Sequence, residues 1–238
     1  MEKLELLIEG LEQIGIAYTE KMLEQFSRYY ELLIEWNEKF NLTAITDPEG
    51  VVVKHFLDSL LLLKAKDLSA TESILDLGTG AGFPGIPLKI IYPSLRLTLM
   101  DSVNKKVQFL NAVVSDLKLD NVQCIHSRAE DLAKNLEHRE HYDVVVSRAV
   151  SNLATLSEYC IPFVRVGGIF ISYKSSDYEM ELEDAKNAIL VLGGVIDSIE
   201  LIPLPASDIN RAYIFISKIK QTQNRYPRKA GMPLKNPL

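Results

Sequence analysis

A glycine-rich turn at residues 78–85 constrains the fold of this chain more than any other segment. Residues 73–77 are mostly apolar and predict a buried strand, and the apolar residues after Pro84 predict a helix. Gly78, Gly80 and Gly82 fall within five residues, and without Cβ atoms they permit a positive φ and let a ligand approach the main chain. This arrangement predicts a ligand site, although a tight connection without a ligand would also use glycine.

The residues around the turn fit two cofactors. Gly80 to Gly85 satisfies G-x-G-x-x-G, and Asp101 follows Gly80 by 21 residues, as a ribose-binding acid does in dinucleotide sites. Asp76 and Gly78 also begin Asp-x-Gly-x-Gly, a pattern typical of class I methyltransferases that bind S-adenosylmethionine. An acid beside a pyrophosphate would be unfavourable. The turn therefore favours S-adenosylmethionine and leaves an NAD-dependent oxidoreductase as the alternative.

Strands and helices alternate from residue 71 onward, which predicts an α/β fold with a Rossmann-like sheet of seven mostly parallel strands. In such a sheet the ligand lies beyond the carboxyl ends of the strands. The last two strands predict a terminal β-hairpin, which is a feature of class I methyltransferases. The expected strands are 73–77, 95–100, 121–126, 142–146, 168–173, 195–201 and 212–219, and the expected helices are 84–91, 104–117, 152–160 and 179–192.

The chain before residue 70 is expected to be a helical extension. A stripe of apolar residues at steps of four and three from Met22 to Phe40 predicts one buried helical face, with Thr19 as the N-cap. Asp47-Pro48 predicts the start of another helix, which carries His55. We therefore expect an N-terminal helical region at 1–70, a methyltransferase domain at 71–220 and a basic C-terminal tail at 221–238.

Basic residues are concentrated at the C-terminal end. The chain has a net charge of −6, but residues 209–238 carry +7 with no Asp or Glu, which leaves −13 for the remainder. Such an asymmetric end can contact phosphates, and the segment from Tyr226 to Pro233 combines an aromatic ring, prolines and cations, as a defined contact segment does. The candidate nucleic-acid contacts are Lys174, Arg211, Arg225, Arg228 and Lys229.

The remaining composition predicts a cytoplasmic enzyme. The hydrophobic fraction is 47% and the charged fraction is 24%, which is ordinary for a globular protein. The first residues lack a basic segment followed by an apolar one, and no apolar run is long enough to span a membrane. Cys124 and Cys160 lie outside any C-x-x-C spacing, so we expect no zinc site and no disulfide framework.

Further motifs are distributed along nearly the whole chain. They are Trp36 to Thr43, His55 to Ser59, the glycine turn through Pro87, Asp101-Ser102 with Lys105-Lys106, Ser127 to Glu130, Ser147 to Ala149 and Tyr226 to Gly231. Together they closely resemble the bacterial ribosomal RNA small subunit methyltransferase G family, also called glucose-inhibited division protein B. The chain departs from many members of that family at Lys174-Ser175, where they have Lys-Gly.

The resemblance implies methyl transfer from S-adenosylmethionine to ring nitrogen 7 of one guanine in 16S ribosomal RNA. The partner is then that RNA or a small ribosomal subunit particle, with no membrane partner, and a monomer is favoured. The resemblance also implies that Arg148 helps to position the substrate. The expected cofactor-binding residues are Gly78, Phe83, Ala129, Glu130 and Arg148 from the resemblance, with Gly80 and Asp101 from the glycine turn and the end of the second strand.

The motif after the fourth strand is consistent with attack by a ring nitrogen. An amino-group methylase would show Asn/Asp-Pro-Pro-aromatic there, and a carbon-5 pyrimidine methylase would need a nucleophilic cysteine. The chain has Ser147 to Val150 instead. Because guanine nitrogen 7 has an available lone pair, no catalytic proton transfer is obligatory. A non-catalytic RNA-binding module that retains a cofactor fold is the remaining alternative.

Overall fold

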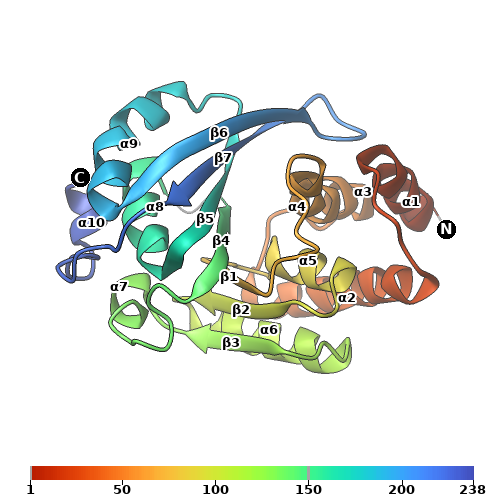
Figure 1. Cartoon of the computed structure of the whole chain (residues 1–238). Coiled ribbons are helices and arrows are strands. Elements are labelled where there is room, and N and C mark those ends of the chain that lie inside the picture. Colours follow the sequence, from red (N-terminus) through yellow and green to blue (C-terminus); the bar gives the residue numbers. More distant parts are fainter. Residues whose placement is uncertain (1, 149–150) are drawn as a thin grey trace.

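A seven-stranded sheet in the order β3-β2-β1-β4-β5-β7-β6 forms the centre of the computed structural model, which describes residues 2–148 and 151–238 (Figure 1). Strands β1 to β5 are parallel, and β7 runs antiparallel between β5 and β6. The terminal β-hairpin is therefore confirmed. The strands are β1 (Ser73–Leu77), β2 (Arg96–Asp101), β3 (Val122–His126), β4 (Tyr142–Arg148), β5 (Val164–Ser175), β6 (Gly194–Pro203) and β7 (Asn210–Lys218).

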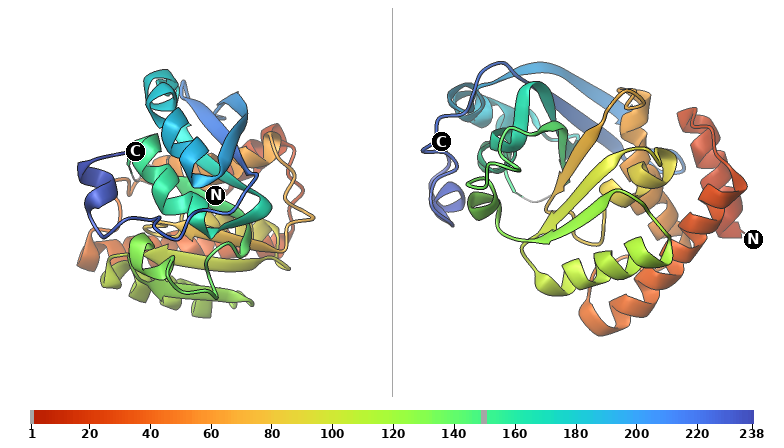
Figure 2. Two further views of the ribbon diagram at one scale, coloured as in Figure 1. Left: turned by 60° about the vertical axis from the view of Figure 1, so that its left-hand side comes forward. Right: turned by 60° about the horizontal axis from the view of Figure 1, so that its bottom comes forward.

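Helices cover both faces of the sheet, because alternate residues of the central strands point to opposite sides (Figures 1 and 2). Ile74 of β1 joins a core with the N-terminal helices, α5 and α6, whereas Leu75 joins a core with α7, α8 and α9. The helices are α1 (Glu2–Ile14), α2 (Glu20–Phe40), α3 (Pro48–Val51), π-helix η1 (Val52–Leu57), α4 (Asp58–Leu60), 3₁₀-helix η2 (Leu61–Lys64), α5 (Gly85–Ile91), α6 (Asn104–Asp116), α7 (Ala129–Leu132), α8 (Leu153–Cys160), 3₁₀-helix η3 (Ile161–Phe163), α9 (Glu179–Leu192) and α10 (Met232–Lys235).

The N-terminal helices pack against α5 and α6 and complete the first core. The side chain of Thr19 accepts a hydrogen bond from Met22 N, so the predicted N-cap of α2 is confirmed. Phe26, Tyr29 and Leu33 of the predicted stripe are fully buried, which confirms core packing for its centre. Helix α2 contacts both α5 and α6, as Figure 2 shows.

The helix expected after Asp47 changes its winding within a few residues. Asp47 caps α3 by accepting a hydrogen bond from Gly50 N, as predicted. The chain then continues as η1, α4 and η2 rather than as one regular α-helix. A π-helical turn widens the helix and is often found at functional sites. Here Lys54 O accepts a hydrogen bond from Arg148 of β4, which ties this helical segment to the sheet.

The predicted strands and helices agree with the structure within a few residues at each end. The largest difference is β5, which extends from Val164 to Ser175 because it pairs with β4 from the Tyr142–Val164 pair and with β7 as far as the Ser175–Arg211 pair. Helix α9 has the predicted bounds, and Asn152 caps α8 by accepting from Thr155 N. Ala149 and Val150, which belong to the motif after β4, lie outside the described residues.

The C-terminal segment, residues 219–238, is folded against the sheet domain. Tyr226 is buried beside α7 and α8, and its carbonyl oxygen accepts a hydrogen bond from Arg139. Arg228 donates to both carboxylate oxygens of Glu158, a fully buried residue of α8. Thr155 also donates to Pro233 O. The predicted basic tail is thus a packed segment that continues into α10 (Figure 2).

We expect the ion pair between Arg228 and Glu158 to hold this segment in place. Replacing Arg228 with Ala leaves the buried Glu158 carboxylate without its cation, which typically costs about 3–5 kcal/mol. Replacing the exposed Lys229 with Ala should change the free energy of unfolding by less than about 0.5 kcal/mol. Urea unfolding of both variants measures this difference, and equal small losses would show that Glu158 does not depend on Arg228.

Candidate functional site

A cavity of about 670 Å³ opens at the carboxyl ends of the parallel strands, next to the glycine turn. All seven residues predicted to bind the cofactor line it, although they are spread over 71 positions of the chain. Its size is typical of small-molecule sites. The predicted residues in its wall are Gly78, Gly80, Phe83, Asp101, Ala129, Glu130 and Arg148.

The glycine turn forms the floor of this cavity. Gly78 and Gly80 have φ values of +71° and +63°, where side chains are rarely accommodated. A Cβ atom on Gly80 would meet no atom within 4 Å, so the space above it is open to a ligand. On the opposite side, the hydroxyl of Tyr29 donates to Ala81 O, so α2 supports the turn from below.

Asp101 connects the end of β2 to the glycine turn. Its Oδ2 atom accepts from Gly80 N at 2.9 Å and its Oδ1 atom accepts from Val103 N at 2.9 Å. The ammonium of Lys106 lies 3.5 Å from Oδ2. The carboxylate is buried but lines the cavity, and a carboxylate oxygen can accept more than one hydrogen bond. Asp101 is therefore placed to receive hydroxyl groups of a ligand.

His55 and Arg148 both contact the ring of Phe83 at the edge of the cavity. The His55 ring lies 4.5 Å from the Phe83 ring at an angle of 18°, and the Arg148 guanidinium lies 5.2 Å from the same ring. Burial, together with the charge of Arg148, lowers the pKa of His55 to about 4. The imidazole is consequently neutral at pH 7, and it lines the cavity rather than facing only the core.

Glu130 lines the cavity and anchors the C-terminal segment beside it. Its Oε1 atom accepts a hydrogen bond from Gly231 N at 3.0 Å, and Gly231 and Leu234 both line the cavity. The sequence placed Glu130 and its neighbour Ala129 near the cofactor, but it did not indicate that the chain end closes the same cavity. No local pattern links residues 101 positions apart.

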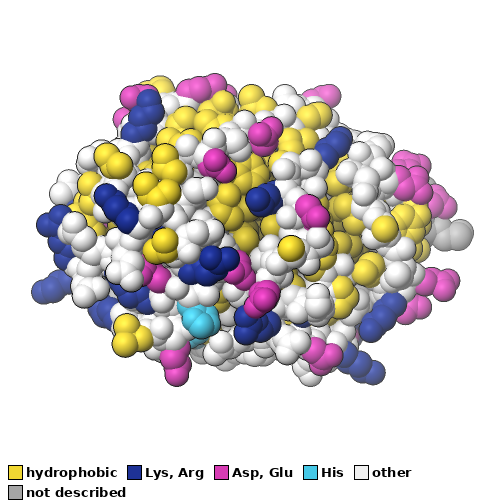
Figure 3. All heavy atoms as spheres, in the orientation of Figure 1, with side chains coloured by type: hydrophobic (Ala, Val, Ile, Leu, Met, Phe, Trp, Pro, Cys, Tyr) yellow, Lys and Arg dark blue, Asp and Glu magenta, His cyan; other side chains and the backbone are white. Residues whose placement is uncertain are grey.

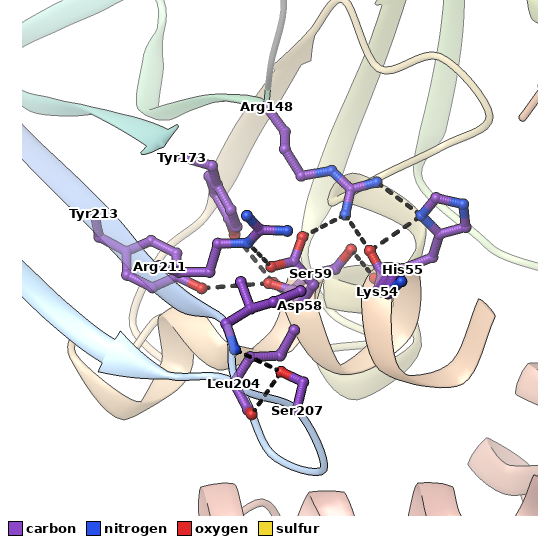
Figure 4. Close-up of polar contacts among 11 residues, drawn as sticks. Lys54, His55, Asp58, Ser59, Arg148, Tyr173, Leu204, Ser207, Arg211 and Tyr213 are labelled. Atoms are coloured by element: carbon purple, nitrogen blue, oxygen red, sulfur yellow. Dashed lines mark hydrogen bonds and ion pairs between the residues drawn. The ribbon is translucent and has the colours of Figure 1, made fainter. Parts of the chain in front are cut away.

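A second polar site surrounds Asp58, a fully buried residue at the start of α4 (Figure 4). Arg148 donates to Asp58 Oδ2 at 2.7 Å, and Arg211 of β7 donates to Oδ1. Tyr173 and Tyr213 donate to the backbone oxygens of Ser59 and Asp58. This cluster, which sequence analysis did not identify, holds Arg148 between the first cavity and a second cavity of about 580 Å³.

The predicted RNA-binding cations have different surroundings. Lys174 and Arg211 line the second cavity and are ion-paired with Glu181 and Asp58. The guanidinium of Arg228 is held by Glu158, because the charge of a buried carboxylate must be offset. Only Arg225 and Lys229 of the five are exposed. Lys and Arg side chains gather at the end of the molecule where the C-terminus lies (Figure 3).

Asp76 does not line the cavity, although it begins the Asp-x-Gly-x-Gly pattern. It is fully buried below the turn, where its Oδ2 atom accepts from Thr79 Oγ1 and Gly85 N at 2.6 and 2.7 Å. Within the described chain, its Oδ1 atom has no hydrogen-bond partner. Burial raises the pKa of Asp76 to about 7, against the opposing effect of these hydrogen bonds. The residue shapes the turn instead of contacting a ligand.

The raised pKa of Asp76 predicts a pH-dependent stability. Between its ordinary value of 3.8 and about 7 the folded protein binds more protons than the unfolded chain, so this carboxyl lowers the free energy of unfolding as pH rises. The slope can reach about 1.4 kcal/mol per pH unit. Asp76→Asn should lack this contribution, and urea unfolding from pH 4 to pH 8 compares the two proteins. Parallel profiles would contradict the raised pKa.

Comparison with known proteins identifies the family. The family model described as GidB, rRNA small subunit methyltransferase G, matches residues 22–205. The chain is 51% identical over 231 residues to the ribosomal RNA small subunit methyltransferase G of Lachnoclostridium phytofermentans, covering 97% of this chain and 96% of that protein. It is 48% identical over 238 residues to that of Alkaliphilus metalliredigens, covering both chains completely.

Solved structures show the same fold at low identity. A mutant of MtNAS in complex with S-adenosylmethionine matches with a TM-score of 0.54 at 17% identity, over 82% of this chain and 75% of that chain. TYW2 of M. jannaschii in complex with AdoMet matches with a TM-score of 0.50 at 17% identity, over 63% of this chain and 70% of that chain. The chain, with its class I methyltransferase fold, belongs to the ribosomal RNA small subunit methyltransferase G family.

Proposed function

We propose that this protein transfers a methyl group from S-adenosylmethionine to ring nitrogen 7 of one guanine in 16S ribosomal RNA, free or in a small ribosomal subunit particle. The family supports a methyltransferase that acts on small subunit ribosomal RNA. The observation that carries the proposal is the single cavity that brings seven predicted cofactor residues together. Family membership does not favour an oxidoreductase or a non-catalytic RNA-binding module.

The residues of the first cavity fit S-adenosylmethionine. Asp101 would accept hydrogen bonds from the ribose hydroxyls, and the open backbone at Gly80 would accommodate the methionine part. Ala129 and Glu130 follow β3, where the adenine edge is expected, and Phe83 supplies apolar surface. When bound, the cofactor supplies an electrophilic methyl group on a positively charged sulfur.

The reaction requires alignment more than acid–base chemistry. The lone pair of guanine nitrogen 7 would form a bond to the methyl carbon of the bound donor, the carbon–sulfur bond would break with its electron pair left on sulfur, and the guanine ring would become positively charged. No proton moves in this step. Arg148, fixed by Asp58 and stacked on Phe83, would orient the base at the junction of the two cavities. The neutral His55 beside it adds no further positive charge.

We also propose that the protein acts in the cytoplasm, as its composition and its ribosomal RNA substrate favour, and that it acts as a monomer. Among the described residues, no helix is both long and apolar enough to cross a membrane.

The reaction is tested with purified protein and methyl-labelled S-adenosylmethionine. We expect label in a single 7-methylguanine after incubation with 16S ribosomal RNA or small subunit particles from cells that lack the enzyme. Mass spectrometry of nuclease fragments locates the label. Label in another base or another atom, or none in either substrate, would contradict the proposed function.

Replacing Gly80 with Ala should weaken cofactor binding. Gly15 is a matched control, because it also has a positive φ and no atom within 4 Å of an added Cβ, but it does not line the cavity. Both variants should lose about 1–2 kcal/mol of stability from backbone strain. Calorimetry with S-adenosylhomocysteine should show at least a roughly tenfold weaker affinity only for Gly80→Ala. Similar affinities for both variants would show that Gly80 does not contact the cofactor.

The exposed cations of the C-terminal segment should contribute to RNA affinity. Each cation that no longer meets a phosphate lowers the salt-dependence slope of binding by roughly one, so replacing Arg225 and Lys229 with Ala should lower it by about two. Replacing Lys21 and Lys66 with Ala removes the same charge from exposed N-terminal positions and should leave the slope unchanged. Filter binding at several salt concentrations measures both. Equal slopes for the two double variants would show that Arg225 and Lys229 do not contact the RNA.

A further inference from the structure

The second cavity shares His55 and Arg148 with the proposed cofactor cavity, so a base held in it would lie beside the methyl donor. We propose that this cavity receives the target guanine, and that the carboxylate of Glu181 recognises the N1–H and N2 amino groups of the base. This inference rests on the proposed function and names the residue that selects guanine.

The charges around the second cavity suit a base on an RNA chain. Its wall contains four cationic side chains and two carboxylates, so it has a positive excess that favours an RNA substrate. The carboxylate of Asp58 is occupied on both oxygens by Arg148 and Arg211 (Figure 4). Glu181 of α9 is the other carboxylate, and its side chain is 37% exposed. The four cations are Lys54, Arg148, Lys174 and Arg211.

Glu181 is held in place but retains acceptor capacity. Its Oε2 atom accepts from Lys174 Nζ at 2.6 Å and from Leu153 N at 3.0 Å, which fixes the side chain between β5 and α8. As far as the described residues show, Oε1 accepts no hydrogen bond. A carboxylate with one oxygen anchored and the other available is preorganised to accept hydrogen bonds from a ligand.

Hydrogen-bond donors complement this acceptor. Arg211 uses Nε to reach Asp58, and within residues 2–148 and 151–238 its two terminal nitrogens have no partner. The ammonium of Lys174 donates to Ser151 O and to Glu181, which leaves one of its three N–H groups. The cavity thus offers donors for a carbonyl oxygen close to an acceptor for N–H groups.

This combination matches guanine among the four bases. Guanine presents two adjacent donors, N1–H and the N2 amino group, next to the O6 acceptor. Adenine has an acceptor at N1, and neither pyrimidine has two adjacent donors. With the donor edge toward Glu181, nitrogen 7 on the opposite side of the purine faces the cofactor cavity, and Arg148 lies beside the base. An enzyme that modifies a base in such a pocket takes it out of the stacked chain.

Inosine tests the inference directly, because it lacks the N2 amino group but keeps N1–H, O6 and nitrogen 7. The substrates are small subunit particles reconstituted with guanine or inosine at the methylated position. The wild-type protein should methylate guanine at least about tenfold faster than inosine in kcat/KM, as loss of a hydrogen bond to a charged group implies. Glu181→Gln should reduce kcat/KM on guanine by roughly 10–100-fold and bring the guanine-to-inosine ratio close to one.

Glu183→Gln is the matched control. Glu183 also lies on α9 and is also ion-paired with a lysine, but it does not line the cavity. It should keep the parent ratio, and both variants should bind S-adenosylhomocysteine with the parent affinity. An unchanged ratio in Glu181→Gln, or wild-type protein that methylates inosine as fast as guanine, would overturn the inference. Failure of wild-type protein to methylate guanine at all would instead contradict the proposed function.

Discussion

The arrangement of the site depends on one buried carboxylate, that of Asp58. It lies between Arg148 of β4 and Arg211 of β7, so it joins the N-terminal helices to two strands of the sheet. A buried carboxylate is costly unless cations offset its charge, and losing one of these partners is strongly destabilising. Because Arg148 borders both cavities, the hydrogen bonds of Asp58 also fix the residue at the junction of the proposed cofactor and guanine sites.

The cofactor cavity is supported from several directions. Asp76 holds the glycine turn from within the core, and Asp101 holds it from the end of β2. Tyr29 of α2 binds the turn from below, and the C-terminal segment reaches Glu130 from the other side. The N-terminal helices and the C-terminal segment are therefore parts of the site. The sequence alone predicts both as regions separate from the sheet domain.

Much of this structure could be predicted from the sequence, because the relevant signals are local. Strand and helix periodicity predicted the sheet, and the glycine turn predicted its ligand edge. Residues at strand ends, such as Asp101 and Arg148, converge because parallel strands share that edge. Asp58 and Glu181 could not be assigned in this way, since Asp58 meets Arg211 across 153 positions of the chain. The ion pair of Arg228 could not be foreseen either, because its partner, Glu158, lies 70 positions earlier.

The central claim is that the two cavities form one reaction site that meets at Arg148. Electron cryo-microscopy of the protein with S-adenosylhomocysteine and a small ribosomal subunit particle tests it most directly. The homocysteine ligand should occupy the cavity above Gly80, and one unstacked guanine should occupy the cavity beside Asp58, with Arg148 beside the base and its nitrogen 7 pointing directly at the ligand's sulfur. A guanine that reaches the sulfur by another route, with the cavity beside Asp58 vacant, would contradict the claim.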